Sequence, residues 1–374
     1  MRRSLLCLLL LLGLSAGCAA PADRAGTDTA AGQVRRAVAE WAAGGGGRPG
    51  GVPVQSWAYE VTSVRVTDGG SRATAGAELR YRLAGYDAAP AGGARDLSLA
   101  AADGRWRVTA DRPAAGALPE LWDQGPVRAV HGRHALVLGS GPREQLTGIA
   151  AEADRAVPAV TAAWPGSWAG RVVVLVPAST ERMAELLGSP PAVYRGMAAV
   201  TTGRVGVSPA PADRVVVNPQ AYGELAGEGR HVVLTHEVTH VATRSETSAS
   251  TPLWLSEGFA DWVAYRDSGR DPADIAPAVR RAVRAGRLPA ALPADEAFGF
   301  GGDQEALSRA YEEAWLACRL IAARWGEEAL LRLYRAAARD PLPTALADVL
   351  GTDLPSLTAA WRSALRTDLG GGTP

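Results

Sequence analysis

The sequence predicts an α+β protein, in which a small α+β domain precedes a larger domain with a short sheet and a helical C-terminal part. Hydrophobic residues make up 47% and charged residues 21% of the 374 residues, as in a globular chain with a real core. Apolar residues alternate with a period of two in residues 57–109, which indicates β-strands. In the C-terminal third they recur at spacings of three and four, which indicates helices.

The first residues have the pattern of an export signal. Two arginines precede the apolar run Leu5–Leu14, whose roughly ten residues are too short to span a bilayer. The segment Leu14–Cys18 resembles a bacterial lipobox, which implies a signal peptide over residues 1–17 and lipidation of Cys18. We therefore expect a tether over residues 18–31 and an exported protein on the outer face of the bacterial cell membrane. The anchor is the lipid at Cys18, and without acylation the protein would be secreted.

Charge and cysteine content narrow the choice of partners. The chain has 39 basic and 39 acidic residues, so no overall field attracts nucleic acid, and we expect no nucleic-acid partner. With Cys7 in the signal peptide and Cys18 lipidated, Cys318 is the remaining cysteine, so no intramolecular disulfide is expected. Cys318 lies in an apolar helical pattern and is expected to be buried.

The first domain is expected over residues 32–112. Its pattern predicts one helix and four strands, with Asp-Gly turn signals after the first and third strands. The predicted helix covers residues 33–43, and the predicted strands cover 57–66, 77–83, 97–101 and 106–109. One helix followed by a curved antiparallel sheet loosely resembles the NTF2-like domains. A linker rich in proline and glycine is expected over residues 113–126.

The second domain is expected over residues 127–370, where strands precede a helical region. Short apolar runs predict strands at 135–138, 172–176 and 215–217. Helices are predicted at 144–164, 180–187, 231–243, 253–266, 276–285, 303–325, 327–338 and 354–369. A small sheet followed by packed helices is an α+β arrangement.

The most informative segment is His236-Glu237-Val238-Thr239-His240, an H-E-x-x-H pattern on a predicted helix. Residues four apart lie on one helix face, so His236 and His240 can both reach one ion at about 2.0–2.1 Å. Glu237 is rotated by about 100° from His236 and lies beside the ion, where it can activate a water molecule. An apolar run, residues 232–234, precedes this pair and would bury it, which is costly unless a metal compensates the polar groups.

A third ligand is predicted on the following helix. Glu257 stands 17 residues after His240, in the segment Leu253–Trp262. Two histidines and one carboxylate, with one position left for water, are typical of catalytic zinc rather than of a closed structural site. Asp261 is one helical turn beyond Glu257 and is placed to accept a hydrogen bond from a ligating histidine. The alternative for Asp261 is a solvated helix residue.

These two motifs together resemble the gluzincin metallopeptidases, especially the peptidase MA-like group related to thermolysin and the M1 aminopeptidases. The resemblance covers roughly residues 170–345. It implies a small sheet with the active-site helix, a lower helical part, zinc (Zn²⁺) in the cleft between them, and a peptide or protein substrate. It also implies His236, His240 and Glu257 as zinc ligands and Glu237 as general base.

Two further positions follow from the resemblance. Related enzymes often have a tyrosine that stabilises the oxyanion, and Tyr311 matches its place; the alternative is a core residue, because Tyr311 shares an apolar helix face with Trp315. The M1 aminopeptidases carry a Gly-x-Met-Glu-Asn segment. The nearest stretch here, Gly196–Ala199, has no acid, which argues against aminopeptidase specificity. The same stretch is a candidate edge strand that pairs with an extended peptide.

The sequence thus predicts zinc-dependent peptide-bond hydrolysis by an exported, lipid-anchored endopeptidase. Two alternatives stay open: a non-catalytic surface lipoprotein that uses this fold as a binding module, and a metal with a purely structural role. The retained base Glu237 argues against both. The remaining histidines, His131, His134 and His231, are expected to lie outside the catalytic site.

Overall fold

The computed structural model describes residues 29–203, 210–299 and 303–370. Within these residues the chain forms thirteen α-helices and two sheets, of four and five strands, which confirms the α+β class. The predicted signal peptide and the predicted lipidation of Cys18 lie outside the described residues. None of the described helices combines the length and apolar character needed to cross a membrane.

The first sheet is antiparallel, with the strand order β1-β2-β3-β4. Helix α1 packs on it, and Val34 and Val38 of this helix are completely buried. The turns after β1 and β3 begin with Asp68 and Asp103, whose φ angles of 51° and 54° are of the kind that Asp tolerates better than most residues. The elements are α1 (Ala30–Ala43), β1 (Val54–Thr67), β2 (Arg72–Leu83), β3 (Ala94–Ala102) and β4 (Arg105–Pro113).

The second sheet has the order β5-β6-β7-β9-β8. Its three central strands are parallel, and both edge strands run antiparallel to their neighbours. The edge strand β5 was not predicted, because its four residues are too few to show a period. The strands are β5 (Arg128–His131), β6 (Ala135–Gly139), β7 (Val172–Val176), β8 (Ala199–Thr202) and β9 (Arg214–Val217).

Both faces of the second sheet are buried, which explains why its central strands are apolar apart from Arg214 of β9. Val137 and Val174 pack into the core formed with the C-terminal helices. Leu136 and Leu138 face the opposite way and join the core of the first sheet. The expected linker also packs here, since its Leu121 is buried in the same core. The two sheets therefore share a continuous apolar interior.

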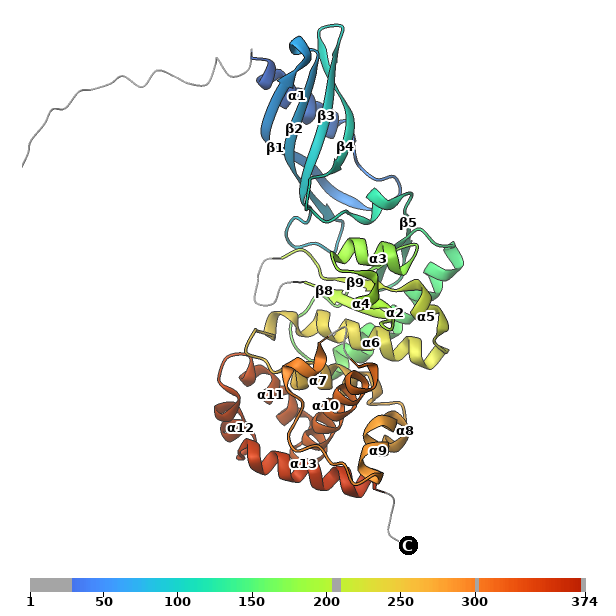
Figure 1. The fold of residues 1–374 in the computed structure, drawn as a ribbon, viewed down its shortest axis with the longest axis vertical. Helices are drawn as coiled ribbons and strands as arrows, with labels where there is room; N and C mark the ends of the chain where they lie inside the picture. Colours follow the sequence, from blue (N-terminus) through green and yellow to red (C-terminus); the bar gives the residue numbers. More distant parts are fainter. Residues whose placement is uncertain (1–28, 204–209, 300–302, 371–374) are drawn as a thin grey trace, which may run out of the picture.

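Helices α2 (Arg143–Ala163) and α6 (Gly227–Thr243) cover one face of the second sheet, and α7 (Leu253–Tyr265) and α10 (Gln304–Trp325) pack beyond α6 (Figure 1). Gly258 allows α7 and α10 to approach closely, because a Cβ at this position would lie 2.3 Å from the main-chain oxygen of Ala314. The other helices are α3 (Thr180–Leu187), α4 (Pro191–Tyr194), α5 (Pro219–Glu224), α8 (Pro272–Ile275), α9 (Pro277–Arg284), α11 (Glu327–Ala337), α12 (Leu342–Leu350) and α13 (Leu354–Leu369).

Candidate metal centre

Helix α6 has an apolar face and a polar face. Leu234, Val238 and Ala242 recur every four residues and are almost completely buried in the core. His236 and His240 have the same spacing on another face, where both side chains remain partly exposed. Burial of the apolar row therefore turns the imidazole pair toward the cavity between α6, α7 and α10.

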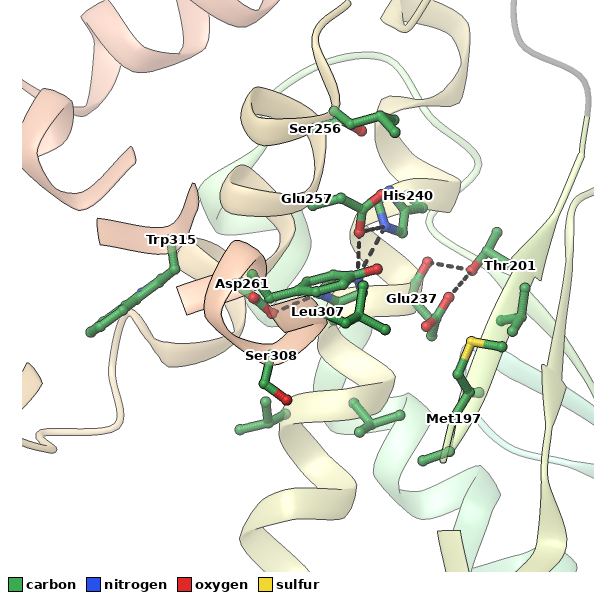
Figure 2. Close-up of a pocket in the computed structure, with 18 of the residues that line it drawn as sticks. Met197, Thr201, Glu237, His240, Ser256, Glu257, Asp261, Leu307, Ser308 and Trp315 are labelled. Atoms are coloured by element: carbon green, nitrogen blue, oxygen red, sulfur yellow. Dashed lines mark hydrogen bonds and ion pairs between the residues drawn. The ribbon is translucent and has the colours of Figure 1, made fainter. Parts of the chain in front are cut away.

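Three ligand atoms from two helices converge on one point. The Nε2 atoms of His236 and His240 lie 3.0 Å apart, and Oε2 of Glu257 lies 3.2 Å and 3.3 Å from them. Figure 2 shows Glu257 facing His240. For tetrahedral zinc with bonds of about 2.0–2.1 Å, ligand atoms are separated by roughly 3.3 Å. His236, His240 and Glu257, called the trio below, therefore fit zinc in donor type and in spacing. Within the described part of the chain, no other group of His, Cys, Asp or Glu side chains forms such a cluster.

Asp261 determines which nitrogen of His236 faces the cluster. Its Oδ1 lies 2.8 Å from Nδ1 of His236, so Nδ1–H donates to the carboxylate and Nε2 presents its lone pair to the other two ligands. The structure thus places Asp261 against a histidine of the trio, with its side chain 16% exposed.

The charges around the trio favour a cation at its centre. Burial alone would lower the pKa of His236, but Asp261, Glu257 and Glu237 together raise the pKa well above its ordinary value. Burial alone would raise the pKa of Glu257, whereas His240 and His236 hold that pKa well below its ordinary range. The Glu257 carboxylate is thus stabilised by the positive charge of the two imidazoles. A divalent metal supplies such charge, as does a proton on the imidazole.

Glu237 lies beside the trio, and its carboxylate accepts a hydrogen bond from the neighbouring sheet. It is 8% exposed, and Thr201 of strand β8 donates a hydrogen bond of 2.6 Å to its Oε2 (Figure 2). The sequence contained no signal for Thr201, because its role depends on the packing of an edge strand against α6.

Tyr311 reaches the cavity from α10. Its ring lies 6.2 Å from the His236 ring and 5.3 Å from the Phe298 ring, measured between centroids. Burial and the carboxylates of Glu257, Asp261 and Glu237 raise the pKa of Tyr311 well above its ordinary value, so the hydroxyl keeps its proton. Tyr311 lines the cavity and also packs against the apolar core, so both interpretations of the sequence describe part of its surroundings.

The cavity in front of the trio has a volume of about 840 Å³, within the usual range of ligand pockets. Strand β8 and the segment before it form one wall, and α7 and α10 form the other. Val232 and Val233 line the end near the start of α6, whereas Arg244, Thr247 and Ser248 line the other end. The trio therefore lies between an apolar half and a polar half of the cavity.

The remaining histidines and the cysteine lie elsewhere. His231 has its Nδ1 3.7 Å from Glu152 on α2, and His134 has its Nδ1 3.2 Å from the main-chain oxygen of Gly170. His131 ends the edge strand β5. Cys318 is completely buried on α10, as expected.

No protein-family model matches the chain, and no curated protein matches it significantly.

Proposed function

We propose that this protein is a zinc-dependent endopeptidase. The observation that carries the proposal is the convergence of the two imidazoles and the Glu257 carboxylate at 3.0–3.3 Å, with Glu237 beside them in a large cavity. Two histidines and one carboxylate from the protein leave a coordination position open, as catalytic zinc requires.

The residues around the trio have distinct roles. When bound, zinc polarises the scissile carbonyl and lowers the pKa of a water molecule to about 7. Glu237 accepts the proton of the attacking water and passes it to the leaving amine. Tyr311, which retains its proton, donates a hydrogen bond to the carbonyl oxygen as negative charge develops there. Asp261 keeps His236 in the required tautomer.

Strand β8 supports a peptide as substrate, because it is an edge strand that lines the cavity. The amide of Asn218 donates to the main-chain oxygen of Ala198, so Ala198 and Val200 form the hydrogen-bonded positions of the β8–β9 pair. The alternation of such pairs directs the N–H and C=O groups of Ala199 and Thr201 to the free edge. An extended peptide pairs with groups of this kind.

The extent of the cavity favours cleavage within a chain. Its lining follows α6 from Val232 to Arg244, the residue just after the helix, which corresponds to about 18 Å at the helical rise. An extended peptide rises by about 3.3 Å per residue, so roughly five residues fit along this length. The trio lies between the two ends of the cavity, so the cavity has room for substrate residues on both sides of the scissile bond.

The decisive experiment compares the wild-type protein with Glu237→Gln and His240→Ala. We expect one zinc ion per wild-type chain, and hydrolysis of peptides from a library that a chelator abolishes. Glu237→Gln should keep the zinc and lose about 10²–10⁴-fold in kcat, since it lacks the base, whereas His240→Ala should lose both. Equal cleavage by wild type and Glu237→Gln would contradict the role of Glu237. Zinc without any hydrolysis would favour the binding-module alternative.

We also propose that the protein is exported and held at the outer membrane face by a lipid on Cys18, as the lipobox resemblance implies. Incorporation of labelled palmitate into the wild-type protein, and not into Cys18→Ser, is the expected result, with the variant released into the medium. Equal labelling of both proteins would refute this anchor.

A further inference from the structure

The hydroxyl group of Thr201 connects the edge strand β8 to the helix that carries the metal ligands. Its Oγ1 lies 2.6 Å from Oε2 of Glu237 and 3.1 Å from the main-chain oxygen of Glu237 (Figure 2). A hydroxyl has one proton to donate, and 2.6 Å is typical of a bond to an ionised oxygen. The main-chain oxygen also belongs to the hydrogen-bond ladder of α6. The Thr201 proton therefore goes to the carboxylate.

The position of Thr201 follows from the alternation of side chains along β8. Val200 points away from α6 and packs beside Met183 and Val216. Ala199 and Thr201 point the other way, toward α6, and Ala199 is buried in that core. Threonine is β-branched, so its χ1 angle is restricted and the hydroxyl has a defined direction.

Glu237 depends on this contact more than the neighbouring acids do on theirs. Asp261 is fixed by His236, and Glu257 by both histidines. Among the described residues, Thr201 supplies the side-chain hydrogen bond that the Glu237 carboxylate receives. Without it, the carboxylate is free to rotate about its last torsion angle, which has a broad energy minimum.

We propose that Thr201 is a positioning residue for the general base. It holds one carboxylate oxygen of Glu237, so that the other oxygen keeps its direction toward the water that attacks the substrate. This inference rests on the proposed hydrolytic function. It adds a requirement that the H-E-x-x-H pattern does not contain, namely a hydroxyl at the second-last position of the edge strand.

The test uses variants that separate the hydroxyl from the shape of the side chain. Thr201→Val keeps the branched shape and removes the donor, whereas Thr201→Ser keeps the donor. On a peptide that the wild type cleaves, we expect kcat to fall about 10–100-fold in Thr201→Val, with KM within about twofold, because the base loses part of its alignment. Thr201→Ser should stay within about threefold of wild type. Both variants should bind zinc as the wild type does.

Thr202→Val is the matched control. The Thr202 hydroxyl lies 3.2 Å from the main-chain oxygen of Arg214, and so it links β8 to β9 rather than to α6. If β8 needs its hydroxyls merely for strand stability, both valine variants should lower kcat alike. Positioning predicts that Thr202→Val leaves kcat within about twofold of wild type.

Crystal structures of the metal-free protein supply a readout that is independent of turnover. The Glu237 carboxylate should keep its position in Thr201→Ser and rotate in Thr201→Val, or in Thr201→Ala if the valine variant does not fold. Wild-type kcat in Thr201→Val, or loss of activity in Thr201→Ser equal to that in Thr201→Val, would overturn the proposal. If the wild type cleaves no peptide, the proposed function fails, and an unmoved carboxylate in the variant crystals would still refute the positioning.

Discussion

The carboxyl group of Glu313 on α10 is a buried acid that the proposed mechanism does not use. Its side chain is 11% exposed, and Oε1 lies 3.7 Å from Nε of Arg309. Burial raises the pKa of Glu313 to about 7, an effect that Arg309 partly opposes and Glu312 increases. The folded protein therefore holds a proton at pH values where the unfolded chain, with a pKa near 4.5, has lost it.

The sign of this shift gives a prediction for Glu313→Gln. The contribution of Glu313 to stability falls as the pH rises from about 4.5 to about 7, because the fold opposes its ionisation. The glutamine stays neutral, so the variant should gain about 2–3 kcal/mol relative to wild type at pH 8 and almost nothing at pH 4. Melting curves of both proteins at the two pH values measure this. A stability difference that does not change with pH would show that Glu313 does not titrate in this window.

At the scale of the elements, helices α7 and α10 pack closely against each other at Gly258. Gly258 follows the ligand Glu257, and a Cβ on it would lie 2.3 Å from the Ala314 oxygen and 3.0 Å from Sγ of Cys318. A methyl group here requires the two helices to move apart, and Glu257 would move with α7. The glycine thus couples helix packing to the geometry of the candidate metal centre.

We therefore expect Gly258→Ala to lose about 1–3 kcal/mol of stability through overpacking and to bind zinc more weakly. Denaturant unfolding and zinc titration measure the two effects. Gly148→Ala is the control, because Gly148 lies inside α2 with open space around its Cβ position. There alanine should be neutral or stabilise by up to about 1 kcal/mol. Similar losses in both variants would indicate a general effect of glycine replacement.

At the scale of the whole molecule, a buried ion pair joins the two sheets. Arg214 of β9 donates to both carboxylate oxygens of Asp87, at 2.9 Å and 3.0 Å, and Asp87 follows strand β2. The Asp87 side chain is 0% exposed and also accepts hydrogen bonds from the amides of Leu83 and Ala212. Together with the shared apolar core, this pair makes the N-terminal sheet part of the support for β9 and its neighbour β8.

Removal of one partner should affect the entire chain. Asp87→Ala leaves the Arg214 guanidinium buried without its carboxylate, which typically costs about 3–5 kcal/mol. Calorimetry should show one unfolding transition in the wild type, shifted down as a unit in the variant, because both sheets share a core. Two separate transitions, of which the variant shifts one, would mean that the sheets unfold independently.

Sequence reasoning succeeded for elements with a clear local period and failed for others. The bounds of α3 were predicted to the residue, and the four strands of the first sheet were placed correctly but too short. Strand β5 and the helices α4, α5, α8 and α12 were missed. The ladder with β6 defines β5, and α12 is only nine residues long with mostly apolar residues, so it lacks a distinct polar face.

For the candidate site, the spacing of His236 and His240 was sufficient to place both imidazoles on one side of α6, because four residues make about one helical turn and the backbone alone enforces it. No local rule places Glu257 at 3.2 Å from His236, directs Asp261 to that imidazole, or brings Thr201 to Glu237. Those contacts join separate elements, and they exist because burial of the apolar faces of α6, α7 and the second sheet packs these elements at fixed distances.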